Sequence, residues 1–157
     1  MAKFEIALPP TALNINGWVN ILERESTKGH EEFPDITPPP DEGLSNMIIQ
    51  TDQPFFARFQ WRVTGLLTRM LGGGSWKCDL LFEAMGVAET GLNPFRTVAD
   101  VGVSGHWYKA DVDVPAFALN PGVYRVIARL QYYDSNGKPG PIAGFDEAHV
   151  VQIYKDE

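Results

Sequence analysis

FFARFQWRVT, at residues 55–64, is the stretch of sequence that decides the fold. Its apolar side chains recur at every second position, and four of the five positions between them hold Arg, Gln or Thr. Successive side chains of a β-strand point to opposite faces of a sheet. The stretch therefore predicts an amphipathic strand that turns one face toward a core.

Alternation of this kind recurs along the rest of the chain, whereas no window shows a sustained 3.6-residue apolar repeat with helix caps. Three further long segments carry it: 75–85, 106–114 and 123–133. Shorter candidates bring the total to about seven strands: 47–51, 97–103 and 148–154. Short strands separated by Gly, Pro and Asn predict an all-β fold of two packed antiparallel sheets. Alternation does not specify strand order, so a jelly roll stays open as an alternative.

Charges on the polar faces predict which strands are neighbours. Opposite charges that face each other across a strand pair contribute about 0.2 to 1 kcal/mol. Two sets are complementary: Arg58 and Arg62 with Asp111 and Asp113, and Asp79 and Glu83 with Arg125 and Arg129. They predict pairing of 55–64 with 106–114 and of 75–85 with 123–133. A simple mixture of charges on solvated faces is the alternative reading.

NPGVYRV, at residues 120–126, resembles the segment that holds the tyrosine corner of immunoglobulin-like and fibronectin type III-like domains. Trp76 is similar in position to the core tryptophan of that fold. The resemblance implies an Ig-like antiparallel β-sandwich over residues 45–157, in which the Tyr124 hydroxyl bonds to upstream backbone. The chain departs from antibody domains because Cys78 is its single cysteine. Such a resemblance implies architecture and not activity.

The amino-terminal part of the chain differs in composition. Residues 23–44 hold seven acidic and two basic residues, a net charge of −5, together with four prolines. This composition favours an extended, solvated connector. Upstream, alternating apolar residues around an Asn16-Gly17 turn signal predict one or two short strands. We therefore expect an arm and acidic linker over 1–44, which packs on its own domain or on a second copy, and a sandwich domain over 45–157.

Net charge and targeting signals limit the partners and the compartment. The chain of 157 residues carries 13 Lys and Arg against 20 Asp and Glu, a formal charge of −7. Affinity for nucleic acid and for anionic membranes depends on clustered cations, so neither is expected as a partner. No apolar run reaches the roughly 18 to 20 residues of a membrane-spanning helix. A single cysteine and the absence of an export signal at the first residues predict a cytoplasmic protein.

Reactive side chains show no catalytic or metal-binding pattern. His30, His106 and His149 lack a recognised ligand spacing, and the triple glycine at 72–74 lacks the lysine and hydroxyl of a phosphate-binding loop. The alternation places Cys78 in the core, where a thiol stays neutral. We therefore expect no metal, no cofactor and no enzymatic activity. A pocket that gathered His106 or His149 with carboxylates would favour an enzyme instead.

Two apolar features are predicted to bind a partner. The loop after residue 64 carries large apolar residues where polar turn residues are usual; they either cap the sandwich or form an interface. The amino-terminal arm is apolar and strand-like. The predicted partner-binding residues are Leu66, Leu67, Met70, Leu71, Phe4, Ile6 and Trp18.

The expected function is that of a non-enzymatic structural, assembly or adaptor protein. It would bind protein partners, either copies of itself or members of a larger complex, through the arm and the apolar loop. The alternative is a carbohydrate- or ligand-binding sandwich. In that case exposed rings of Trp18, Phe56 and Trp107 would stack on sugar faces.

Overall fold

The chain folds as two β-sheets packed face to face around one apolar core. The structure is a computed structural model that describes residues 3–5, 8–24, 48–86 and 90–156. Within these ranges the single helix is a short 3₁₀ helix, η1 (Leu66–Leu71). The predicted all-β sandwich is thereby confirmed.

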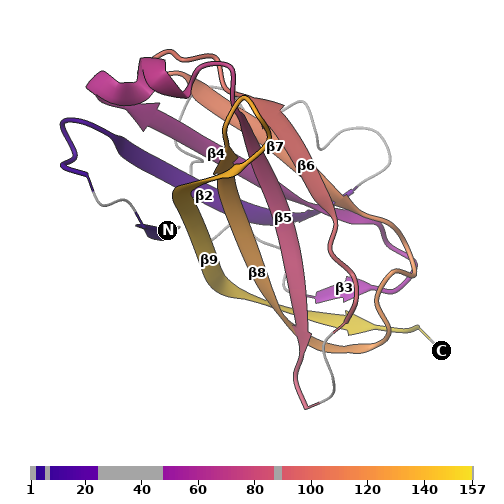
Figure 1. Ribbon diagram of the computed structural model, residues 1–157. Helices are drawn as coiled ribbons and strands as arrows, with labels where there is room; N and C mark the ends of the chain where they lie inside the picture. The colour runs from indigo at the N-terminus through magenta and orange to yellow at the C-terminus, as the bar shows by residue number, and fades with distance from the viewer. Residues whose placement is uncertain (1–2, 6–7, 25–47, 87–89, 157) are drawn as a thin grey trace.

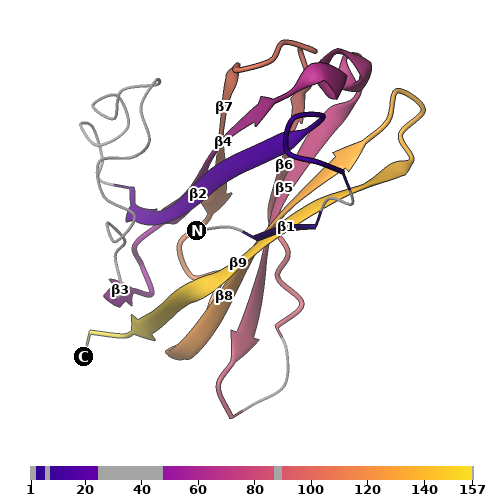
Figure 2. The same ribbon diagram turned by 90° about the vertical axis from the view of Figure 1, so that its left-hand side faces the viewer.

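The larger sheet contains six strands and the smaller sheet three (Figure 1). The larger sheet has the order β1 (Lys3–Glu5), β9 (Pro139–Tyr154), β8 (Gly122–Tyr133), β5 (Ser75–Ala84) and β6 (Phe95–Ala99), with β3 (Ile48–Gln50) also on β9. The smaller sheet has the order β2 (Asn14–Glu23), β4 (Phe55–Thr64) and β7 (Trp107–Val114). Figure 2 shows the two sheets as separate layers. All pairs are antiparallel except β3 with β9, which is parallel.

Both strand pairs predicted from charge are present. β4 pairs with β7, and β5 pairs with β8. Three of the expected charge pairs lie directly opposite each other and form ion pairs: Arg58 with Asp111, Asp79 with Arg129, and Glu83 with Arg125. The fourth differs, because Asp113 pairs with Arg24 at the end of β2 and Arg62 lies opposite Trp107.

The amino-terminal strand belongs to the sandwich itself. β2 pairs with β4 of the same chain along all ten of its residues, and it buries Ile15, Val19 and Ile21 in the core. Burial of each such side chain contributes about 1.5 to 3 kcal/mol, which favours packing in cis over a free arm. The predicted linker began at residue 23, but Glu23 is the last residue of β2 and still pairs with Phe55. The rest of the linker from residue 25, and the boundary at residue 44, lie outside the described residues.

A turn was expected at Asn16-Gly17, but β2 continues through both residues. Gly17 lies opposite Trp61 of β4 and lines a small space between the sheets beside the Trp61 side chain. The glycine therefore accommodates a large neighbour and does not reverse the chain.

The core is aromatic at the end of the sandwich nearest η1. The Trp61 ring stacks on Tyr108 at 5.3 Å and meets Trp76 edge-on at 6.2 Å, and Trp76 meets Tyr132 at 5.2 Å between ring centroids. All four rings are buried. The Tyr132 hydroxyl donates a 2.7 Å hydrogen bond to the carbonyl of Leu71, so the cluster fixes the last residue of η1.

Two local predictions are confirmed in the larger sheet, at Tyr124 of β8 and Cys78 of β5. The Tyr124 hydroxyl donates a 2.8 Å hydrogen bond to the backbone carbonyl of Asn120, as a tyrosine corner requires. Cys78 is fully buried, and burial raises the pKa of its thiol. The thiol is therefore neutral and inaccessible in the folded chain.

Candidate partner-binding surface

The apolar loop at 65–72 folds as η1 because its first residues bond to two other segments. Gly65 has φ of 120°, and a Cβ at that position would lie 2.4 Å from the carbonyl oxygen of Ala12. Its N–H donates to Oγ of Ser104 at 3.1 Å, and the N–H of Leu67 donates to Ala12 at 2.9 Å. The start of η1 is thus held between the β1–β2 and β6–β7 connections.

The four predicted loop residues divide into a buried and an exposed set. Leu71, the last residue of η1, is buried and contributes to the core, and Leu67 is half-buried. Leu66 is 85% exposed and Met70 is 76% exposed. Capping of the sandwich accounts for Leu71 but leaves Leu66 and Met70 without a role in the fold.

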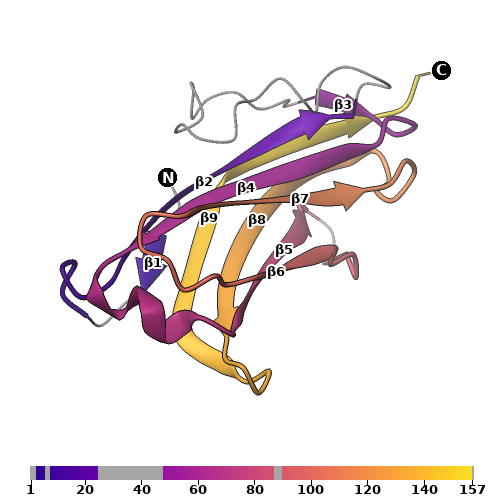
Figure 3. The same ribbon diagram turned by 90° about the horizontal axis from the view of Figure 1, so that it is seen from above.

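The β6–β7 connection adds two further exposed apolar residues at this end. Val101 is 51% exposed and Val103 is 55% exposed. Between them, Gly102 approaches η1 so closely that a Cβ there would lie 3.1 Å from Cα of Gly72. We refer to Leu66, Met70, Val101 and Val103 as the end patch. Figure 3 shows η1 and the β6–β7 connection at one end of the molecule.

Asp100 holds this connection against the core. Its Oδ2 accepts a hydrogen bond from Nε1 of Trp76 at 2.7 Å, and its Oδ1 accepts one from the N–H of Gly102 at 2.6 Å. The N–H of Val101 donates to the hydroxyl of Tyr108 at 3.1 Å. Burial raises the pKa of Tyr108 to about 12, so this hydroxyl stays neutral at physiological pH. The end patch is therefore displayed on a backbone that buried groups fix in place.

An open hollow of about 760 Å³ lies between η1 and the β6–β7 connection. Leu66, Arg69 and Val103 are among the residues that line it. Arg69 is exposed, and within the described part of the chain no acidic residue pairs with it. The surface thus combines apolar side chains with one cation.

The other predicted binding residues do not join the end patch. Trp18 lies on β2 opposite Gln60, and its ring stacks on Trp107 at a centroid distance of 5.5 Å. Phe4 lies on β1 opposite Gly144 of β9. Ile6 is outside the described residues. Strand pairing therefore separates these positions from η1.

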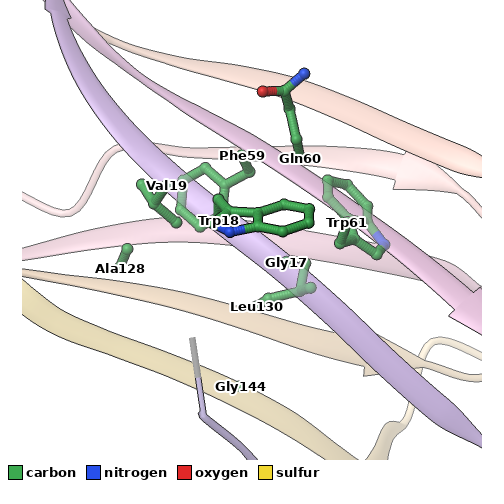
Figure 4. Close-up of a pocket in the computed structure, with 9 residues that line it drawn as sticks. All are labelled: Gly17, Trp18, Val19, Phe59, Gln60, Trp61, Ala128, Leu130 and Gly144. Carbon is green, nitrogen blue, oxygen red and sulfur yellow. The ribbon is translucent and has the colours of Figure 1, made fainter. Parts of the chain in front are cut away.

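Figure 4 shows a second space, between the two sheets beside Trp18 and Trp61. It exists because Gly17 of β2 and Gly144 of β9 contribute no side chain to the interior. Its volume is about 10 Å³, which accommodates a single water molecule at most. This space is too small for an organic ligand.

The aromatic residues expected to bind sugars are not arranged for that role. Phe56 is 1% exposed, because its ring packs against the guanidinium groups of Arg24 and Arg58 at 5.8 and 5.4 Å. Trp18 and Trp107 are half-buried and cover each other. The expectation of an exposed Phe56 is therefore wrong, and its ring offers no open face to a sugar.

In β9 a histidine lies close to a carboxylate. Nε2 of His149 lies 3.7 Å from Oδ2 of Asp146, where a bulge in β9 turns both side chains inward. This exceeds the length of a hydrogen bond. His106 is exposed and packs its ring edge-on against Tyr108. In the described ranges no group of three or more His, Cys, Asp or Glu residues is placed to hold a metal ion.

Val101 and Val103 were not among the predicted binding residues. Alternation over 97–103 indicates a strand, but β6 ends at Ala99, where Asp100 turns inward to reach Trp76. Gly102 and Gly105, which flank the pair Val103-Ser104, both have positive φ. They are the sequence signal that a loop, and not a strand, begins here.

No protein-family model matches the chain, and no curated protein matches its sequence. Among the described residues there is no helix of the length and hydrophobicity that a membrane crossing requires.

Proposed function

We propose that this chain is a non-enzymatic assembly or adaptor protein, which binds a protein partner through the end patch. The observation that carries the proposal is the convergence of Leu66 and Met70 with Val101 and Val103 on two loops fixed to the core. Large exposed apolar side chains gathered at one end of a domain commonly mark a protein interface. Because the backbone beneath it is already fixed, binding costs little conformational entropy.

We further infer an Ig-like arrangement of the sandwich. The pairs β4–β7 and β5–β8 would correspond to the B–E and C–F pairs of that fold, and the Tyr124 to Asn120 hydrogen bond supports this assignment. A buried free thiol at Cys78 suits the reducing cytoplasm that we propose as its setting. We expect neither nucleic acid nor membrane as a partner.

Paired substitution of the end patch tests the proposal. We expect Leu66→Asp with Met70→Asp to abolish association without loss of folding, because both side chains are exposed. Val150→Asp is the matched control, since it charges an exposed position of β9 opposite Arg125. The molecular mass in solution, measured as a function of concentration, reports self-association. Binding to other proteins is measured by immobilising each variant and comparing the proteins that it retains. Identical behaviour of wild type and double variant in both measurements would contradict the proposal.

A further inference from the structure

A second exposed apolar residue of unusual conformation lies at the other end of the sandwich. Phe117, in the connection between β7 and β8, is 75% exposed. Its φ is 62°, and it is the one non-glycine residue with positive φ in the described part of the chain. The N–H of Ala118 donates to the carbonyl of Pro115 at 3.3 Å, which closes a turn around Phe117.

Phe117 is unfavourable for the isolated chain in two respects. Left-handed backbone is a genuine outlier for a bulky side chain, and turns that need it usually hold Gly or Asn. Exposure of the ring then forgoes the free energy that burial of a phenylalanine provides. The turn is nevertheless fixed, since the N–H of Phe117 donates to the carbonyl of Thr51 at 2.7 Å. Strain retained at an exposed residue indicates a function outside the fold.

Charge distinguishes the two ends. Asp52, which follows Thr51, is exposed beside the Phe117 turn, whereas Arg69 is exposed at the rim of the hollow by the end patch. Neither side chain forms an ion pair with another described residue. An acidic, aromatic projection at one end therefore complements a basic, apolar hollow at the other.

One molecule cannot join its own two ends. Thr51 lies before β4 and Gly65 directly after it, and a ten-residue strand spans about 33 Å. Figures 1 and 3 show η1 and the β7–β8 connection at opposite ends of the molecule. Complementary surfaces at opposite ends produce a heterologous contact between copies, which repeats in a row or closes as a ring.

We propose that Phe117 of one copy occupies the hollow beside the end patch of the next, so that copies assemble head to tail. Asp52 then faces Arg69 across the contact, and the ring of Phe117 packs on Leu66 and Val103. This inference rests on the proposed function, since it assigns the partner of the same surface. It adds that the partner is a second copy of this chain and that its contact site is the Phe117 turn.

Charge reversal tests the pairing. Asp52→Arg places a second cation opposite Arg69, and Arg69→Asp places a second carboxylate opposite Asp52. The association constant of each variant alone should therefore be at least tenfold lower than that of the wild type. An equimolar mixture of the two variants presents opposite charges at every contact. We expect the mixture to regain the solution mass of the wild type at equal total concentration, measured by sedimentation.

Phe117→Asn supplies an independent test, because Asn tolerates positive φ and removes the ring. Its melting temperature should equal or exceed that of the wild type, while association falls at least tenfold. A wild type that stays monomeric at all concentrations up to about 1 mM, where a contact with a dissociation constant below that value would be populated, would overturn the head-to-tail inference. Loss of association in Leu66→Asp with Met70→Asp, but not in Phe117→Asn or the charge variants, would also overturn it while the proposed function stands. Association unaffected by any variant would overturn both.

Discussion

Nε1 of Trp76 and Oδ2 of Asp100 lie 2.7 Å apart, and this hydrogen bond joins the aromatic core to the connection that exposes Val101 and Val103. Asp100 is itself buried. Its second oxygen accepts the N–H of Gly102, so one carboxylate serves a core donor and a loop donor together. The shape of the end patch therefore depends on a residue that is itself buried.

Asp100→Ala should lower the free energy of unfolding by about 1 to 3 kcal/mol for each donor left without an acceptor. Urea unfolding measures the loss, and faster hydrogen exchange at Gly102 would show that the connection has loosened. Asp134→Ala is the control. Asp134 also accepts two N–H groups, from Asn136 and Lys138, but in an exposed turn where water replaces it, and its cost should stay below about 1 kcal/mol. Equal costs for the two substitutions would contradict the assigned role of Asp100.

Two ion pairs of different burial should differ in their contribution to stability. Asp79 is 1% exposed and is held by Arg129 and by the amide of Asn93. Arg129→Ala leaves that carboxylate buried without its cation and should cost about 3 kcal/mol. Arg24→Ala breaks the exposed pair with Asp113 and should cost less than about 1 kcal/mol. Denaturant unfolding measures both, and a larger loss for Arg24→Ala would show that the burial argument is wrong.

Stability should fall at alkaline pH because of Cys78. Its ordinary pKa is 9.0, and desolvation by burial, with the charge of Asp79 as a smaller cause, raises the pKa in the folded chain. Above pH 9 the unfolded chain loses this proton and the folded chain keeps it, so the free energy of unfolding decreases as pH rises. Cys78→Ala is the comparison, since its stability should decline less over pH 9 to 10. A thiol reagent that modified native Cys78 as fast as the unfolded chain would contradict this account.

Alternation predicted β4 at the bounds that the structure has, and charge predicted the strand pairs β4–β7 and β5–β8. These features follow from the two-residue period and from side chains directly opposite each other. Burial of Phe56 and Arg58 was not predictable in this way, because alternation assigns the second face of a strand to water. Phe56 packs against Arg24 and Arg58 pairs with Asp111, and both of these partners are distant in sequence.

The surface residues were predictable only in part. An apolar run in a loop identified Leu66 and Met70, but the sequence did not separate them from Leu71, because burial depends on where η1 meets the core. Phe117 gave no signal in the sequence. Its significance lies in a backbone angle, which tertiary contacts with Thr51 impose.

Photo-crosslinking from position 70 tests most directly whether the end patch binds a protein. With a benzophenone side chain at Met70, we expect a covalent product between two polypeptides, formed at least tenfold more than from Val150 on the outer face of β9. Mass spectrometry of that product should identify the second polypeptide as another copy joined near Phe117. Equal yields from the two positions, or products within one chain alone, would contradict the account.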